Sequence, residues 1–281
     1  MADKILIIDG YNMIHRCRFS WGGGTAIGDN QIAYNFFRTL KSAIAEFSPD
    51  IVYFPLDGKP KQRLEADPTY KANRAIDTTD PETVAYWNYF RSQKRLIIDS
   101  LTSDYPIRVL RHKDQECDDL IYYLVKYHHS NDDVVILSSD TDFIQVLNEY
   151  PDTVKLYNPI SKKYRQNTEY DYVAWKAMVG DKADNISGVK GIGVKTAEKI
   201  MRKDGELDRR MKEDSFRVPF EKSYGLIKFI DLKDDEGNII MSSSDLDMDS
   251  IESSFQIMNF ESMLNDKYLE SYEQVFNQLK R

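Results

Sequence analysis

The chain has 281 residues, of which 41% are hydrophobic and 30% are charged. This composition is typical of soluble globular proteins with one large or two modest domains, and no apolar run approaches membrane-spanning length. The formal net charge of −8 disfavours nucleic acid as a partner only if the charge is evenly spread, because the distribution of charge matters more than the total. Without the nine carboxylates that are assigned to metal ions below, the balance becomes +1.

The first residues and the cysteines indicate the compartment. Met1 to Lys4 lead directly into an apolar run and lack the layout of a signal peptide. Cys17 and Cys117 do not make a disulfide framework, and two free thiols suit a reducing cytosol. We therefore expect a cytoplasmic protein.

Strand and helix patterns alternate from the start of the chain. Residues 4–8 form a continuous apolar run, which predicts a strand buried on both faces, and Asp9 follows it. Residues 31–47 carry apolar side chains at helical spacing. Residues 51–54 predict a second buried strand, and it leads to Asp57. Pro55 implies that this strand is an edge strand or bends.

The segment from 59 to 74 has a different character, since it contains five basic residues and only two acidic ones. The basic residues are Lys59, Lys61, Arg63, Lys71 and Arg74. Tyr70 lies among them and could stack on an unpaired base. Residues 77–81 predict a helix start, and residues 82–101 predict a long helix.

Further acidic residues lie next to the predicted elements that follow. Residues 107–110 predict a third strand, and Glu116-Cys117-Asp118-Asp119 opens a helix. Residues 134–137 predict a fourth buried strand, which is followed by Asp140 and Asp142. A short helix from residue 143 and a strand at 154–157 come next.

This alternation predicts an α/β fold with a mainly parallel central sheet flanked by helices. Ligands in such sheets collect beyond the carboxyl ends of the strands, where Asp9, Asp57 and Asp140 are expected. Taken alone, each acid is better explained by a turn or a helix cap than by a metal site. Together they would repel one another unless a cation lay between them.

The second half of the chain adds a helix at 170–179 and two acids, Asp181 and Asp184, that are spaced to face the same way on a helical turn. A Gly-x-Gly turn follows at Gly191 and Gly193, which exposes backbone N–H groups that suit a phosphate. Residues 224–232 contain a short apolar run. Residues 231–253 are acidic and serine-rich and predict a solvated loop, and residues 268–279 predict a terminal helix.

Many carboxylates at one edge form the arrangement that hard, oxygen-preferring cations such as Mg²⁺ or Mn²⁺ require. Two such ions activate water, orient a phosphodiester and stabilise the leaving oxygen. Lys71 and Arg74 could stabilise charge on the scissile phosphate. No grouping of Ser, His and Asp and no phosphate-binding Gly-x-x-x-x-Gly-Lys loop competes with this chemistry.

Five segments, in this order, carry a resemblance to a known family. They are Asp9-Gly10-x-Asn12; Tyr70-Lys71-x-Asn73-Arg74; Glu116-x-Asp118-Asp119; Ser139-Asp140-x-Asp142; and Gly180-Asp181-x-x-Asp184-Asn185 with Gly191-Ile192-Gly193. The chain resembles the 5′-nuclease superfamily of flap endonucleases, and most closely its small bacteriophage members, the phage 5′→3′ exonucleases also called phage ribonuclease H. The resemblance covers about residues 4–203, with a weaker echo at 224–232.

The resemblance implies the PIN-like 5′-nuclease fold. Residues 1–180 would form the α/β nuclease domain, including a helical arch at about 59–101 through which a single-stranded 5′ end passes. Residues 181–281 would form a helical DNA-binding region with a helix-hairpin-helix-type element at about 184–203 and a C-terminal tail. The chain would be the free-standing form without a polymerase domain, in the host cytoplasm if it is phage-encoded.

The resemblance also assigns roles to residues. The first metal position would use Asp9, Asp57, Glu116, Asp118 or Asp119, and Asp140; the second would use Asp142, Asp181 and Asp184. Lys71 and Arg74 would be the catalytic cations. The residues that bind nucleic acid would be Arg16, Arg63, Tyr70, Lys190, Gly191, Gly193 and Lys195. The cofactors would be two or more Mg²⁺ ions, for which Mn²⁺ can substitute, with a K⁺ ion at the hairpin of Gly191 and Gly193 in many relatives. The chain has Thr141 where relatives often have Gly.

The carboxylate set together with the resemblance implies a metal-dependent, structure-selective 5′ nuclease that acts during replication and RNA-primer removal and leaves 5′-phosphate and 3′-hydroxyl ends. Its partners would be DNA with 5′ flaps, nicks or 5′ ends and RNA/DNA hybrids, with a single-strand-binding protein or a sliding clamp as further candidates and no membrane. Two alternatives stay open: a non-catalytic DNA-structure-binding protein and a PIN-type ribonuclease. The first requires the loss of ligand residues, and the second predicts neither the Tyr70–Arg74 motif nor the glycine turn.

Overall fold

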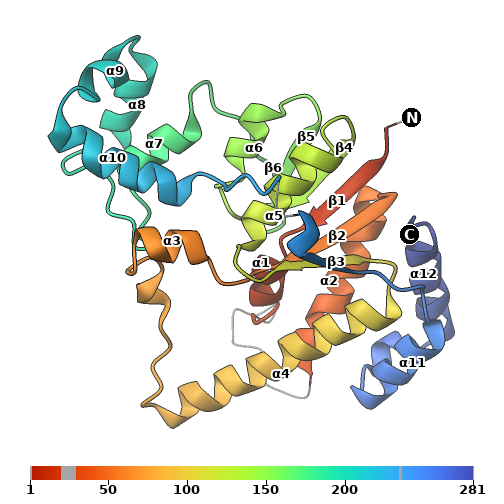
Figure 1. Cartoon of the computed structure of the whole chain (residues 1–281). Helices are drawn as coiled ribbons and strands as arrows, with labels where there is room; N and C mark the ends of the chain where they lie inside the picture. The colour runs from red at the N-terminus through yellow and green to blue at the C-terminus, as the bar shows by residue number, and fades with distance from the viewer. Residues whose placement is uncertain (1, 20–29, 234–235, 281) are drawn as a thin grey trace.

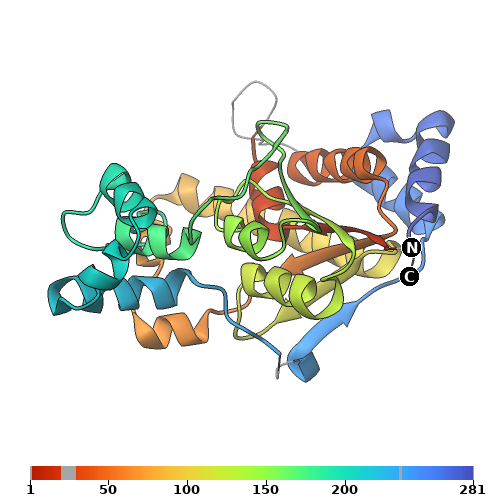
Figure 2. The ribbon, with the colours of Figure 1, turned by 90° about the horizontal axis from the view of Figure 1, so that it is seen from above.

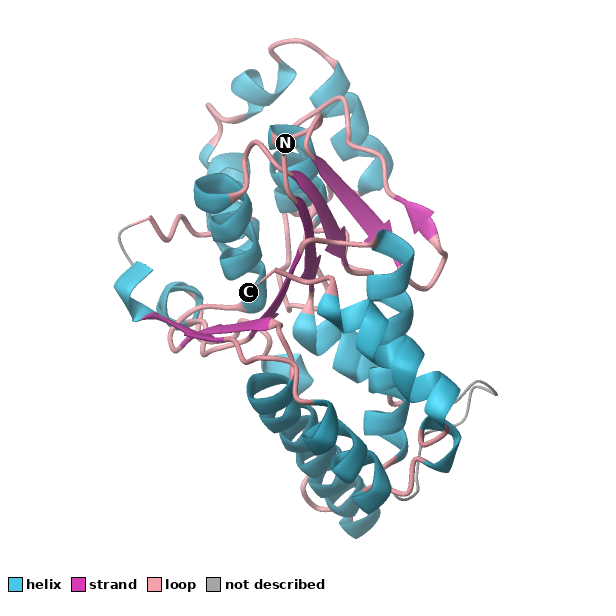
Figure 3. Ribbon diagram, turned by 90° about the vertical axis from the view of Figure 1, so that its right-hand side faces the viewer, coloured by secondary structure: helices cyan, strands magenta, loops and turns pink. Residues whose placement is uncertain are grey.

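The structure is a computed structural model that describes residues 2–19, 30–233 and 236–280. A seven-stranded sheet forms the centre of the described part, with the strand order β6-β5-β4-β1-β2-β3-β7 (Figures 1 and 3). The parallel strands are β1 (Lys4–Ile8), β2 (Ile51–Leu56), β3 (Arg108–His112), β4 (Asp133–Leu137) and β5 (Val154–Asn158). The edge strands β6 (Lys163–Tyr164) and β7 (Ile239–Ser242) run antiparallel to their neighbours. The predicted mainly parallel α/β sheet is confirmed.

The prediction that Pro55 marks an edge or a bend is wrong for the edge, because β2 lies between β1 and β3. The register of β1 with β2 ends at the pair of Ile7 and Tyr53, and β1 itself ends at Ile8. Pro55 therefore comes just beyond the end of β1, and it still pairs with Leu110 of β3. A missing N–H costs little at a position where one neighbouring strand has ended.

Helices cover both faces of the sheet (Figure 2). One face is covered by α1 (Gly10–Arg16), α2 (Gln31–Phe47) and α4 (Pro81–Asp104). The last elements, α11 (Met248–Ile257), the 3-10 turn η4 (Glu261–Met263) and α12 (Asp266–Asn277), join the same hydrophobic cluster, with α11 packed on α4 and α12 packed on α2. The other face packs against α5 (Cys117–Tyr123), the π-helical turn η2 (Leu124–His128) and α6 (Ile144–Glu149). The predicted helix at 31–47 is confirmed, because its apolar residues fall on the one side that faces the sheet.

The predicted arch at about 59–101 consists of α3 (Lys61–Ala66), the 3-10 turn η1 (Ala72–Arg74), an extended stretch and α4. In Figure 1 the chain leaves α3, runs away from the sheet to the start of α4, and returns along that helix. Asp80 begins α4 by accepting a hydrogen bond from the backbone N–H of Thr83, and Pro81 occupies the first helical position. Both are favoured helix-start residues, as the sequence indicated.

A third hydrophobic cluster lies to one side of the sheet, at the upper left of Figure 1. It is built from α3, α7 (Tyr172–Val179), α8 (Val194–Arg202), α9 (Glu206–Arg210) and α10 (Asp214–Ile227). We call these helices the helical region. The division predicted at residue 180 differs from this arrangement, because α7 packs in the helical region and the chain after residue 238 returns to the sheet.

The prediction of a solvated loop at 231–253 is wrong for most of its described residues. After the 3-10 turn η3 (Glu236–Asn238), β7 pairs with β3, with Met241 opposite Leu110. α11 then buries Ile251 and Phe255 among the helices on one side of the sheet, where the Phe255 ring contacts Phe37 of α2. The acidic composition of this stretch gave no weight to its three consecutive apolar residues, 239–241. Their pairing with β3 depends on residues far away in the sequence, so local composition does not reveal it. Residues 234–235 lie outside the described part.

No helix in the described ranges combines the length and the apolar character that crossing a bilayer requires.

The last helix, α12, is an integral part of the core, because Tyr272 and Phe276 are fully buried. We expect Phe276→Ala to lower the free energy of unfolding by about 3–5 kcal/mol, the usual cost of such a cavity. The control Gln274→Ala, on the exposed side of the same helix, should change it by no more than about 0.5 kcal/mol. Urea denaturation measures both. Equal, small effects would show that α12 contributes little to the core.

Candidate functional site

Four carboxylates meet at the carboxyl edge of the parallel strands. Asp9 follows β1, Asp57 follows β2, Asp140 follows β4, and Asp118 lies in the first turn of α5. One oxygen each of Asp9 and Asp118 and the Sγ of Cys117 all lie within 4.8 Å of one another. The strand order places β1 between β4 and β2, so the ends of these three strands are neighbours. This edge is where ligands bind in parallel sheets.

Hydrogen bonds hold these side chains in place. The Ser138 hydroxyl donates to Oδ2 of Asp9 over 2.7 Å, and the backbone N–H of Cys117 donates to Oδ1 of Asp57 over 2.8 Å. The backbone N–H of Asp140 donates to the Ser138 hydroxyl over 3.0 Å. Ser138 therefore connects the ends of β1 and β4, and it fixes two of the carboxylates relative to each other.

Burial and mutual repulsion change the acidity of this group. Burial, together with the charges of Asp57 and Asp140, raises the pKa of Asp9 to about 7, although the Ser138 hydrogen bond opposes the change. Burial also raises the pKa of Asp57. The pKa of Asp118 lies well above its usual value because of burial and the charges of Asp9 and Asp140. Each shift shows that the ionised form of the side chain lacks compensation.

None of these four carboxylates has an ion-pair partner among the residues that the structure describes. Asp9 is 6% exposed and the other three are half-buried. Carboxylates with so little access to solvent normally pair with a cation or lose their charge. Carboxylate oxygens are the donors that Mg²⁺ and Mn²⁺ prefer, so the donor set fits a divalent cation. We call Asp9, Asp57, Asp118 and Asp140 the bare carboxylates.

Asp142 and Asp181 form a separate group around Lys176 of α7. The Lys176 ammonium donates to Oδ1 of Asp142 and lies 2.7 Å from Oδ2 of Asp181. Burial raises the pKa of Asp142 to about 6, with the charge of Asp140 adding to the effect and Lys176 opposing it. Burial acts on Asp181 in the same sense, but the hydrogen bond and charge of Lys176 outweigh it and hold the pKa of Asp181 below its usual value. One buried cation of the chain thus serves both acids.

Lys71 and Arg74 contact the remaining acids. The Lys71 ammonium donates to Oε1 of Glu116 and lies 3.6 Å from Oδ2 of Asp184. The Arg74 guanidinium pairs with Oδ1 of Asp184. Backbone contacts hold the two segments together, since the N–H of Lys71 donates to the carbonyl of Asp184 over 3.0 Å. The structure thus brings both predicted catalytic cations to the acidic edge.

Asp119 has a different environment from its neighbour Asp118. It is fully buried and forms a two-pronged ion pair with Arg63, at 2.6 and 2.8 Å. Arg63 also donates to Glu116 and to the backbone carbonyls of Leu226 and Lys228, at the end of α10. Asp119 is therefore committed to Arg63 and does not join the bare carboxylates.

Two residues predicted to bind nucleic acid are buried. Arg63 is 4% exposed, and Tyr70 is 5% exposed. The Tyr70 hydroxyl donates to Glu116 over 3.0 Å, and its ring packs in the cluster of the helical region. In this arrangement neither side chain presents a surface to a nucleotide.

The other predicted contacts with nucleic acid are accessible. Arg16 ends α1 and is partly exposed, whereas Lys190 and Lys195 are exposed. Gly191 and Gly193, also exposed, form the turn that enters α8, and no helix occupies 184–190 in the described chain. Gly191 has a φ of +82°, which glycine adopts without strain. The helix-hairpin-helix-type element predicted at about 184–203 therefore consists of a turn that leads into a single helix, α8.

Sequence reasoning missed Ser138, Lys176 and the contact of Tyr172 with Thr141. The Tyr172 hydroxyl donates to Thr141 over 2.9 Å and so ties α7 to the loop between Asp140 and Asp142. Ser138 could have been found, because a hydroxyl next to an acidic strand end is a natural hydrogen-bond donor. Lys176 gave no signal, because a single lysine in a helix normally faces solvent.

Comparison with known proteins identifies the group to which this arrangement is related. The family described as 5′-3′ exonuclease, N-terminal resolvase-like domain, matches residues 4–179. The thermostable DNA polymerase I of Thermus thermophilus is 33% identical over 217 residues, which cover 73% of this chain and 24% of the polymerase. That of Thermus filiformis is 31% identical over 234 residues, which cover 78% of this chain and 26% of the polymerase. The chain thus spans about a quarter of the length of these curated relatives.

Solved structures share the fold at lower sequence identity. The bacteriophage T5 flap endonuclease, crystallised with DNA and metal ions, has a TM-score of 0.65 and 20% identity, covering 98% of this chain and 99% of its own. The catalytic core of Rad2 in complex with DNA substrate has a TM-score of 0.52 and 14% identity, covering 99% of this chain and 93% of its own. These likenesses show the fold.

The raised pKa of Asp9 predicts how stability depends on pH without metal. The native state holds a proton on Asp9 that the unfolded chain has lost, so stability falls as pH rises from about 4 to 7 and is level above that. We expect Asp9→Asn to exceed the parent in free energy of unfolding by about 2–4 kcal/mol at pH 8 in EDTA, and by less at pH 5. Urea unfolding at both pH values checks this. A variant that is less stable than the parent by the same amount at both would contradict it.

The ion pair of Arg63 and Asp119 predicts a non-additive pair of mutations. Arg63→Met leaves a buried carboxylate without a partner and should cost about 3–5 kcal/mol of unfolding free energy. The double variant Arg63→Met/Asp119→Leu should cost clearly less than the sum of the two single changes, as a double-mutant cycle measures. Lys61→Met, on the exposed side of the same helix, is the matched control. Additive costs would show that the pair is not coupled.

Proposed function

Because this chain belongs to the 5′-3′ exonuclease family, we propose that it is a divalent-metal-dependent, structure-selective 5′ nuclease. It acts as a 5′→3′ exonuclease and flap endonuclease on DNA and RNA-primed DNA during replication, and it leaves 5′-phosphate and 3′-hydroxyl ends. The observation that carries the proposal is the set of bare carboxylates beside Lys71 at the sheet edge. A largely buried group of acids without cations lowers the stability of the fold, and metal-assisted phosphodiester hydrolysis explains why the chain retains it.

The proposal assigns the metal ligands as follows. Asp9, Asp57, Asp118 and Asp140 hold the first Mg²⁺, for which Mn²⁺ can substitute. Asp118 is preferred to Asp119 because Asp119 is bound by Arg63. Asp142, Asp181 and Asp184 serve the second position, where an ion competes with Lys176 for two of the carboxylates. Bound divalent cations supply Lewis acidity at the phosphate.

Lys71 and Arg74 are assigned as the catalytic cations. Lys71 contacts Glu116, and Arg74 contacts Asp184. The side chain of Arg74 is 54% exposed. A cation that is only partly covered can exchange one oxygen partner for another at low cost. A scissile phosphate at this edge offers such oxygens, and the two cations stabilise the charge that develops on it.

The substrates of this proposal are DNA with 5′ flaps, nicks or 5′ ends and RNA/DNA hybrids. The exposed turn at Gly191 and Gly193, with Lys190 and Lys195, is suited to duplex phosphates and to a K⁺ ion. The arch segment offers a passage for a single-stranded 5′ end. A single-strand-binding protein or a sliding clamp belongs to the proposal as a protein partner.

The test is cleavage of end-labelled flap, nicked and RNA-primed duplexes with and without Mg²⁺. We expect Asp118→Asn and Asp140→Asn to reduce cleavage by about 100-fold or more, because a metal ligand supplies several kcal/mol of stabilisation. Asp204→Asn, an exposed acid of the helical region, is the matched control and should retain activity.

Each alternative has its own outcome. Undiminished cleavage by both variants would remove the bare carboxylates from the mechanism. Binding of flaps without Mg²⁺-dependent cleavage in the parent chain would favour a DNA-structure-binding protein. Activity confined to single-stranded RNA would favour a PIN-type ribonuclease.

A further inference from the structure

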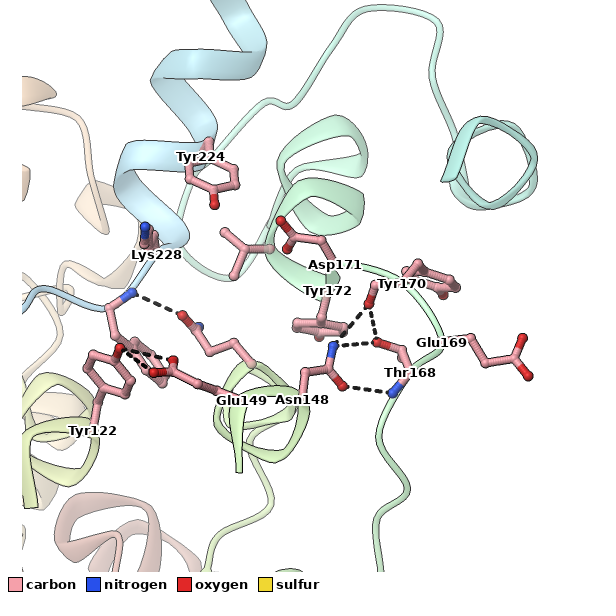
Figure 4. A pocket seen from close by; sticks show the side chains of 13 residues that line it. Tyr122, Asn148, Glu149, Thr168, Glu169, Tyr170, Asp171, Tyr172, Tyr224 and Lys228 are labelled. Carbon is pink, nitrogen blue, oxygen red and sulfur yellow. Dashed lines mark hydrogen bonds between the residues drawn. The ribbon is translucent and has the colours of Figure 1, made fainter. Parts of the chain in front are cut away.

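A cavity of about 460 Å³ lies away from the bare carboxylates (Figure 4). Its walls come from α5 and α6, from the loop before α7, and from the end of α10. None of the proposed metal ligands lines it. The cavity therefore lies where the sheet-packed helices meet the helical region, and ligand sites of this size favour such junctions.

The amide groups of the cavity are already used. Asn148 accepts a hydrogen bond from the Thr168 N–H over 2.9 Å, and it donates to the Thr168 hydroxyl and to the Tyr170 carbonyl (Figure 4). Gln145 accepts from the Phe229 N–H over 3.0 Å. These hydrogen bonds fix the shape of the cavity and occupy the side-chain amides of Asn148 and Gln145. Recognition of a ligand must therefore depend on the other side chains.

The charged side chains of the cavity are mostly acidic. Glu149, Glu169 and Asp171 line it together with one lysine, Lys228, and the Glu169 side chain points away from the others (Figure 4). Neither Glu149 nor Asp171 has an ion-pair partner within the described residues. Their hydrogen bonds are to neutral groups, because Glu149 accepts from the Tyr122 hydroxyl and Asp171 accepts from the N–H of Ala174. Glu149 and Asp171 are both exposed where they line the cavity, and two unpaired negative charges on one cavity wall together attract a cation.

Tyrosine rings supply the second feature. Tyr122, Tyr170 and Tyr224 line the cavity from three different segments. In Figure 4 the Tyr224 hydroxyl points into the space between α10 and α7. Burial, and after it the negative charge of Asp171, raise the pKa of the Tyr224 hydroxyl. Aromatic faces attract ammonium and guanidinium groups through their quadrupole.

We propose that this cavity binds an organic cation that carries primary ammonium or guanidinium groups. The carboxylates of Glu149 and Asp171 neutralise its charge, and the tyrosine rings cover its alkyl or planar part. Two sources offer this chemistry: a free polyamine, and the lysine or arginine side chain of a partner protein. The proposal does not rest on the nuclease activity.

The test is isothermal titration of the full-length protein at about 0.15 M salt, which screens non-specific attraction. The probes are spermidine and a short blocked peptide with one arginine, and glutarate serves as the anionic control. We expect saturable binding of at least one cation and none of glutarate. Binding of spermidine alone identifies a free polyamine, and binding of the peptide identifies a protein side chain. Absence of saturable binding by both cations would overturn the proposal.

Two isosteric variants locate the site. Glu149→Gln and Asp171→Asn each remove one charge, and asparagine preserves the helix cap at the start of α7. Each should weaken binding by about tenfold. Asp152→Asn, an exposed acid outside the cavity, should leave the affinity unchanged. Unfolding midpoints confirm that the variants are folded. Equal affinities in all four proteins would place the cation elsewhere and reject the assignment.

Discussion

Repulsion among the bare carboxylates is the constraint on which the rest of the structure depends. Three of these acids follow neighbouring strands, so the order of the sheet brings them together before any ligand arrives. Burial then raises the pKa values of Asp9, Asp57 and Asp118, which means that the fold holds these groups at a cost. The hydrophobic clusters on both faces of the sheet offset this unfavourable free energy, because they hold each strand in place independently of the acids.

The chain's own cations are placed around this edge, not within it. Lys71, Lys176 and Arg63 each neutralise acids that flank the bare carboxylates. Each also joins the sheet-packed part to the helical region, since Lys176 lies on α7 and Arg63 binds carbonyls at the end of α10. The same ion pairs that confine the negative charge therefore fix the position of the helices that carry the exposed glycine turn. Chemistry and duplex binding, as proposed, share one electrostatic framework.

The sequence sufficed where a pattern was local. Continuous apolar runs located β1, β2 and β4, and helical spacing located α2 at its observed limits. It failed for β7, whose few apolar residues acquire a role only by pairing with β3. At the site, residue types predicted a concentration of acids and cations at the sheet edge. They could not show that Tyr70 turns inward or that Lys176 is buried, because the direction of a side chain depends on its tertiary neighbours.

Asp118 and Asp119 show how backbone geometry resolves what composition leaves open. Successive residues of a helix point about 100° apart, so two adjacent acids at the start of α5 cannot both face the sheet edge. Asp118 approaches Asp9, whereas Asp119 turns toward α3 and meets Arg63. Arg63 also binds Glu116, the residue that begins α5. The ion pair of Asp119 with Arg63 therefore helps to fix the start of the helix that carries Asp118. The pair of acids thus divides into a structural member and a candidate ligand, and the first determines where the second lies.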